Sequence, residues 1–187
     1  MISAISTYFQ NSFSTPTQIA GQTVGFIATL ISLFAFVFIS RRRIIAAKLA
    51  TDVLWVFSFA LCGAMTGAVT NVVSTLREGI FYFKRDSWKR LWFIPLTFIA
   101  FYIGSALLTW SGPISLIPMV ASAFSVLGLW MSDPLHTKLW LVPALILWLV
   151  YSLITYSVMS ALSNTLSLIS VFIGLLREYR VRRNGNK

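Results

Sequence analysis

The sequence predicts an all-α polytopic membrane protein, with seven transmembrane helices arranged as two parallel three-helix repeats joined by a linker helix. Three observations favour this class. Of the 187 residues, 57% are hydrophobic and 11% are charged, whereas a soluble domain carries about 25% charged residues. The charges are confined to four clusters that are separated by long neutral stretches. The first and last parts of the chain also share rare residues at one constant spacing.

The neutral stretches locate the expected spans. No Asp, Glu, Lys or Arg occurs in residues 1–40, 53–76, 91–132 or 139–176. A spanning helix needs about 20 apolar residues, so the last two stretches each hold two helices and the first holds one. Two crossings around 53–76, extending into its charged flanks, place every basic cluster on one side, as the positive-inside rule prefers. We therefore expect spans at 18–40, 45–62, 66–84, 91–110, 114–131, 138–155 and 158–177.

Seven spans place the N-terminus on the outer side of the membrane and the C-terminus on the cytoplasmic side. The net charge of +10 is then explained by cytoplasmic loops that face membrane lipids, and nucleic acid is not needed as a partner. We expect no cleavable signal peptide, because no basic region precedes the mild apolar stretch at the start. The chain then divides into an N-terminal extracytoplasmic tail (1–17), a first three-helix repeat (18–85), a cytoplasmic loop and linker helix (86–110), a second three-helix repeat (111–178) and a basic cytoplasmic tail (179–187).

An internal repeat is indicated when the chain is compared with itself at a shift of 93 residues. The shift aligns spans 1–3 with spans 5–7 without a gap, and the fourth span restores the orientation, so the two copies are parallel. Overall identity is low, and the argument depends on rare residues that match. The matches are Trp55 with Trp148, Leu54 with Leu147, Asn71 with Asn164, Ser74 with Ser167, Ala68 with Ala161, Ser32 with Ser125 and Lys84 with Arg177.

The duplicated Trp/Asn pair predicts a central binding site. Trp55 and Asn71 straddle a short turn, as do Trp148 and Asn164, which places both members of each pair at one depth near the bilayer midplane. An aromatic face beside an amide binds a small polar solute by stacking and hydrogen bonding. The alternative is that the asparagines join helices and the tryptophans pack, without any solute.

Small and hydroxylated residues support the pocket. Segments 66–75 and 157–170 are rich in Ser, Thr, Gly and Ala, a composition typical of helices that face protein or a wet path. We expect Ser74 and Ser167 to join the two Trp/Asn pairs in binding the solute.

Three charged residues fall inside the expected spans. Asp52 and Arg77 lie at similar depth, so we expect them to pair as an inner gate or clamp, with Lys48 as a competing partner for Asp52. A structural clamp is favoured over a proton-sensitive switch. We expect Glu78 to face elsewhere, near the headgroups beside Lys84 or Arg85.

No motif of an enzyme or a metal site is present in the sequence. His136 stands beside Asp133 and Lys138 in an expected loop, without the His, Cys and carboxylate set of a metal site. The single cysteine, Cys62, excludes an intrachain disulfide. No hydrolase elbow or nucleotide-binding loop occurs. We therefore expect no catalytic residues, no metal and no cofactor.

Four segments resemble the bacterial YgjV-type inner-membrane proteins, which belong with the SWEET, semiSWEET and PQ-loop carriers. The segments are IAGQTVGFIATLISLFAFVFISRRR, GAMTGAVTNVVSTLREGIFYFKR, GPISLIPMVASAFSVLGLWM and SALSNTLSLISVFIGLLREYR. In SWEET carriers a Trp of the second helix and an Asn of the third line the sugar pocket, which corresponds by position to Trp55 and Asn71 and to Trp148 and Asn164. The Pro-Gln motif of the PQ-loop group is absent, and the hinge prolines of those carriers have counterparts only in Pro118 and Pro143.

These observations predict a facilitative carrier of a small polar solute, such as a sugar. The alternatives are a membrane scaffold or accessory subunit, in which the same residues pack helices, and a solute-binding receptor without a transport cycle. A centre filled by Phe would favour the scaffold, and a wet cavity that reaches all four Trp and Asn residues would favour the carrier. Because the chain contains both copies, a monomer suffices, and a homo-oligomer is also compatible.

Overall fold

The computed structural model is all-helical over the residues that it describes, which are 2–35, 41–83, 88, 91–131 and 134–185. In this part of the chain, eight α-helices follow one another, with a short 3-10 turn, η2 (Pro113–Ser115), before the sixth. The helices are α1 (Ile2–Ser12), α2 (Pro16–Ala35), α3 (Arg41–Leu61), α4 (Met65–Tyr82), α5 (Phe93–Leu108), α6 (Leu116–Trp130), α7 (Pro134–Ile154) and α8 (Val158–Gly185).

A helix lies over each of the seven ranges that the sequence predicted as spans. Three helical segments are long and apolar enough to cross a membrane, namely Pro113–Trp130, Leu135–Ile154 and Val158–Leu176, and Phe93–Leu108 is a shorter apolar helix. The expected all-α membrane class is thereby confirmed. Two details differ from the prediction, because the expected tail 1–17 contains α1, and His136 lies in the first turn of α7 instead of a loop. The expected contacts of Lys84, Arg85 and Asp133 lie outside the described residues.

Local sequence signals explain where α2 begins. Thr15 and Gln18 form a capping box, in which the Gln18 backbone N–H donates to Thr15 Oγ1 at 3.2 Å and the Thr15 N–H donates to Gln18 Oε1 at 3.2 Å. Pro16 stands at the first helical position, where its missing N–H costs nothing. These contacts satisfy N–H groups that the helix leaves without a partner.

The turns after α3 and α7 are built alike. Gly63 has φ +78° and Tyr156 has φ +55°, both in the left-handed region that ends a helix. The next residue in each turn donates its N–H to the carbonyl five positions back, from Ala64 to Phe59 at 2.9 Å and from Ser157 to Ser152 at 2.9 Å. The three positions of the first turn therefore match those of the second at the same shift of 93 residues.

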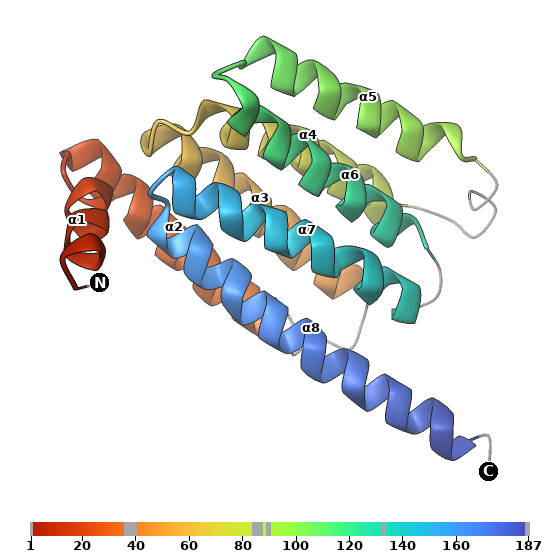
Figure 1. Cartoon of the computed structure of the whole chain (residues 1–187). Helices are drawn as coiled ribbons and strands as arrows, with labels where there is room; N and C mark the ends of the chain where they lie inside the picture. The colour runs from red at the N-terminus through yellow and green to blue at the C-terminus, as the bar shows by residue number, and fades with distance from the viewer. Residues whose placement is uncertain (1, 36–40, 84–87, 89–90, 132–133, 186–187) are drawn as a thin grey trace.

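Six helices contact one another in a closed ring, in the order α2, α3, α4, α6, α7 and α8. Helices α2–α4 and α6–α8 form two triplets, and the contacts α2–α8 and α4–α6 join them. Helix α5 packs outside the ring against α4 and α6 (Figure 1). Helix α8 continues beyond the other helices toward the C-terminus (Figure 1).

Small residues let α2 approach α3 closely. The Ser58 hydroxyl donates to the Gly21 carbonyl at 2.8 Å. A Cβ added at Gly21 would lie 2.8 Å from Cys62 Sγ, and one at Gly25 would lie 2.9 Å from Ser58 Oγ. The Gly-x-x-x-Gly pair is therefore a close-packing motif in this protein.

Candidate functional site

A cavity of about 140 Å³ lies inside the ring, between the two triplets. Side chains of α3, α4, α6, α7 and α8 line it. The eight residues predicted from the sequence are all among the lining residues, which are Lys48, Thr51, Asp52, Trp55, Phe59, Asn71, Ser74, Arg77, Ser122, Ser125, Leu141, Leu145, Trp148, Ser160, Ser163, Asn164 and Ser167. The structure thus brings together, at one cavity, residues that are up to 119 positions apart in the chain, from Lys48 to Ser167.

Aromatic rings close the end of the cavity nearest the α3–α4 and α7–α8 turns. Phe59 is 2% exposed, and its ring centroid lies 6.0 Å from that of Trp55 and 5.7 Å from that of Trp148. The ring centroid of Tyr151 lies 5.8 Å from that of Phe59. One phenylalanine therefore seals this end, while the two tryptophans remain part of the cavity wall.

Tyr151 also caps α4 across the interface between the triplets. Its hydroxyl accepts a hydrogen bond from the Gly67 N–H at 2.9 Å, and that N–H belongs to the first turn of α4, where the helix supplies no acceptor. Gly67 is required for this approach, since a Cβ there would lie 2.7 Å from Tyr151 Cε1. The closure thus depends on the pairing of a glycine with a tyrosine on the opposite triplet.

The N-terminal helix adds an outer layer at the same end. The Tyr8 hydroxyl donates to the Ser152 carbonyl at 3.5 Å, and its ring lies 5.3 Å from that of Tyr156. Burial and the neighbouring Tyr156 raise the pKa of the Tyr8 phenol, so it remains a neutral donor. Gln22 joins α2 to the α7–α8 turn, because its Nε2 donates to the Tyr156 carbonyl at 2.8 Å.

The two asparagines are oriented by the same device. Asn71 Nδ2 donates to the Gly67 carbonyl at 2.8 Å, and Asn164 Nδ2 donates to the Ser160 carbonyl at 2.9 Å, each four residues back on its own helix. A carbonyl oxygen accepts but does not donate, so the amide nitrogen has to face it. The Oδ1 atom of each amide is left to accept a hydrogen bond, and both asparagines line the cavity.

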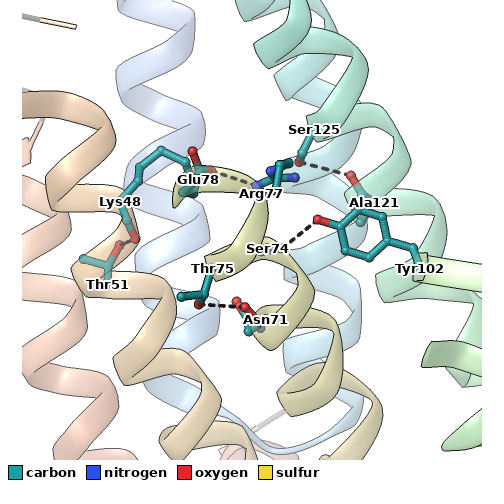
Figure 2. Close-up of polar contacts among 10 residues, drawn as sticks. All are labelled: Lys48, Thr51, Asn71, Ser74, Thr75, Arg77, Glu78, Tyr102, Ala121 and Ser125. Atoms are coloured by element: carbon teal, nitrogen blue, oxygen red, sulfur yellow. Dashed lines mark hydrogen bonds and ion pairs between the residues drawn. The ribbon is translucent and has the colours of Figure 1, made fainter. Parts of the chain in front are cut away.

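Hydroxyl groups extend this polar wall. Ser160 contacts Asn164 Nδ2 through its Oγ at 3.3 Å and Ser152 Oγ at 2.6 Å. Ser74 lies 3.0 Å from the Tyr102 hydroxyl, which ties α4 to α5 (Figure 2). The predicted Ser74 therefore has a partner behind the wall, and its orientation is set by α5.

Charged side chains gather at the opposite end of the cavity, near the start of α3 and the end of α4. Arg77 Nη2 lies 2.8 Å from Glu78 Oε1, and Lys48 Nζ lies 3.6 Å from the same oxygen (Figure 2). Glu78 is fully buried. The expectation that Glu78 faces the headgroups is therefore wrong.

The expected direct pair of Asp52 with Arg77 is corrected by the same geometry. Within the described part of the chain, Arg77 forms its ion pair with Glu78, the next residue on α4, and Asp52 forms no ion pair within 4.0 Å. Asp52 still interacts electrostatically with Lys48, Glu78 and Arg77. Neighbouring residues on a helix usually project in different directions, so a pair of Arg77 with Glu78 was not expected from their spacing.

Sequence reasoning missed several lining residues. Ser160 occupies the position in α8 that Gly67 occupies in α4, four residues before the asparagine, and this spacing was a usable signal. Phe59 and Ser122 carry no such signal, because their place in the wall depends on how α3 and α6 pack. Among the described residues, no group of three or more His, Cys, Asp or Glu side chains is arranged to hold a metal ion.

The helical architecture and the apolar segments define an α-helical membrane protein with a polar internal cavity. The chain belongs to the Imp-YgjV family of bacterial inner membrane proteins, whose model matches residues 19–182. No match was found among curated proteins or among solved structures.

Proposed function

We propose that this protein is a facilitative carrier that moves a small polar solute through the central cavity. The observation that carries the proposal is the convergence of Trp55, Asn71, Trp148 and Asn164 on one cavity of about 140 Å³ between the triplets. A scaffold needs a filled centre, whereas this centre contains a space lined by amides, hydroxyls and charges. Binding at the interface between two repeats is the usual place for a carrier's substrate.

The proposed architecture has seven spans, α2–α8, in a 3+1+3 arrangement with α5 as the linker. Helix bounds support it, because α3 and α7 both have 21 residues, and α7 and α8 begin 93 positions after α3 and α4. The shift of 93 residues matches α2 with α6 and α4 with α8, so the α2–α8 contact corresponds to the α4–α6 contact. A twofold axis along the membrane normal requires this correspondence. We place the N-terminus outside and the C-terminus inside.

This orientation gives the two ends of the cavity different roles. The aromatic closure of Phe59 and Tyr151 would face outward, and the charged end would face the cytoplasm. The structure then corresponds to a state closed toward the outside by Phe59, Tyr151 and the α1 layer. Alternating access requires that the Tyr151–Gly67 hydrogen bond opens and closes during transport.

Uptake into proteoliposomes tests the proposal. The wild type is compared with the Asn71→Ala/Asn164→Ala variant, using labelled sugars, polyols and amino acids. We expect one class of solute to enter through the wild type and its uptake to fall at least about tenfold in the variant, because two hydrogen bonds to the solute are lost.

The matched control is Thr23→Ala/Thr97→Ala. Thr23 and Thr97 are exposed, and each donates to a carbonyl four residues back, at 2.9 and 2.8 Å, so the control removes two similar hydrogen bonds outside the cavity. Uptake that survives the asparagine variant, or that falls equally in the control, contradicts a central site. Thermal melts in detergent show whether each variant is folded.

A further inference from the structure

At the charged end of the cavity, several buried polar atoms have no hydrogen-bond partner among the described residues. They are Asp52 Oδ2, Glu78 Oε2, Arg77 Nε, Arg77 Nη1 and Ser122 Oγ. Asp52 is 7% exposed, Arg77 2% and Ser122 1%. Buried polar groups in native proteins are nearly always hydrogen-bonded, and a buried charge without a partner is costly. Unpartnered groups on a cavity wall point to a ligand that completes their bonds.

The charges at this end are balanced but not evenly paired. Lys48 and Arg77 share the single oxygen Glu78 Oε1, at 3.6 and 2.8 Å, while Asp52 forms no ion pair within 4.0 Å among the described residues. Two cations and two carboxylates sum to zero. A ligand with a single charge would unbalance these four charges, whereas a ligand that carries both charges leaves them balanced.

The cavity wall offers both kinds of binding group. Asp52 and the Oδ1 atoms of Asn71 and Asn164 are acceptors, as a primary ammonium with three donors requires. The faces of Trp55 and Trp148 attract the same cation. Arg77 and Ser122 supply donors for a carboxylate.

The volume restricts the size of the ligand. A cavity of about 150 Å³ in another protein accommodates benzene, and this cavity measures about 140 Å³. A hexose has about twice as many non-hydrogen atoms as benzene, and the pockets for drug-sized ligands begin at about 300 Å³. The space therefore suits a solute as small as alanine.

We propose that the cavity binds a small zwitterion of the amino-acid type, with its ammonium on Asp52, Asn71 and Asn164 and its carboxylate on Arg77 and Ser122. This inference rests on the proposed carrier function and names the substrate class of that same site. It replaces a sugar as the expected solute.

Binding to the purified full-length protein in detergent tests the inference. Four probes of similar size are compared by calorimetry: alanine as the zwitterion, propionate as the anion, alaninol as the cation and lactamide as the neutral molecule. We expect alanine to bind at least about tenfold more tightly than each of the others, because each of them lacks one or both charges that the site requires. Equal binding of lactamide, or no binding of alanine, overturns the inference.

A single substitution separates the two halves of the site. In Asp52→Asn, we expect the affinity for alanine to fall at least about tenfold. We expect the affinity for propionate to be kept or to rise, since the carboxylate partners remain and the site loses one negative charge. Among the described residues, Asp52 Oδ2 has no hydrogen-bond partner and Asp52 forms no ion pair within 4.0 Å, so its replacement breaks no direct contact of these kinds. Its longer-range interactions with Lys48, Glu78 and Arg77 are weakened, and the melting temperature without ligand checks folding. Asp133→Asn, outside the described residues, controls for the change in net charge. An unchanged affinity for alanine in Asp52→Asn overturns the inference.

Uptake distinguishes this inference from the carrier proposal. Alanine that binds through Asp52 but does not enter proteoliposomes supports the zwitterion site and contradicts the carrier. Glucose that enters through a route lost in Asn71→Ala/Asn164→Ala, while alanine does not bind, overturns the zwitterion site and supports the carrier. Entry of alanine that is lost in both Asp52→Asn and the asparagine variant supports both.

Discussion

Glu78, whose side chain is 1% exposed, pairs with two cations through one carboxylate oxygen. Replacing it with glutamine leaves Arg77, which is 2% exposed, without its ion pair. We expect Glu78→Gln to lower the free energy of unfolding by about 3–5 kcal/mol, the cost of removing one member of a buried pair. Denaturation in mild detergent measures the loss.

The double variant Arg77→Gln/Glu78→Gln provides the comparison. It removes both members of the pair and restores charge balance between Lys48 and Asp52, so we expect a smaller loss than in the single variant. A double variant that is less stable than Glu78→Gln would contradict the view that the uncompensated arginine is the main cost.

Some residues of the site could be predicted from the sequence and others could not. Trp55, Asn71, Trp148 and Asn164 could be predicted to share a site because rare residues recur at one spacing, and they line one cavity. The partner of Arg77 could not be predicted, since the choice between Asp52 on α3 and Glu78 on α4 depends on the direction that its long side chain takes. Ser122 lines the cavity only through the approach of α6 to α4.

At the scale of helices, the α3–α4 turn allows the free-energy cost of a left-handed backbone conformation to be measured separately from packing. Gly63 has φ +78°, and a Cβ added there would meet no atom within 4 Å. Gly63→Ala therefore changes strain without changing packing, and we expect a loss of about 1–2 kcal/mol in the free energy of unfolding.

Gly104 is the matched control for this substitution. It lies within α5, and a Cβ there also meets no atom within 4 Å, but its backbone is helical. Alanine is the better helix former by about 1 kcal/mol, so we expect Gly104→Ala to leave stability unchanged or to raise it. The melting temperature should fall in Gly63→Ala and should stay the same or rise in Gly104→Ala. A loss in both variants would indicate that added methyl groups disturb packing at either site.

The helices themselves were largely predictable, because neutral stretches and the charge clusters between them mark α2–α8 along the chain. Helix α1 was not predicted, since residues 2–12 lack a long apolar run. Its place depends on tertiary contacts of Tyr8 with Ser152 and Tyr156, which are more than 140 positions away. Contacts of that range leave no periodic signal in the local sequence.

At the scale of the whole molecule, the basic residues make the orientation testable. The positive-inside rule places the clusters at 41–52, 77–90 and 177–187 in the cytoplasm, and an odd number of spans then puts the two termini on opposite sides. In a Cys62→Ser background, cysteines are introduced singly at Thr17, an exposed residue at the start of α2, and at Asn186.

A membrane-impermeant thiol reagent should label Thr17→Cys in intact spheroplasts, whereas it should label Asn186→Cys only after the spheroplasts are lysed. Labelling of both sites from outside, or of neither, would place the termini on one side and contradict seven spans. Labelling of Asn186→Cys alone would retain the odd number of spans but invert the protein, so that the charged end of the cavity would face outward. The aromatic closure at Phe59 and Tyr151 would then seal the cytoplasmic side, and the zwitterion would enter this state of the carrier from outside the cell.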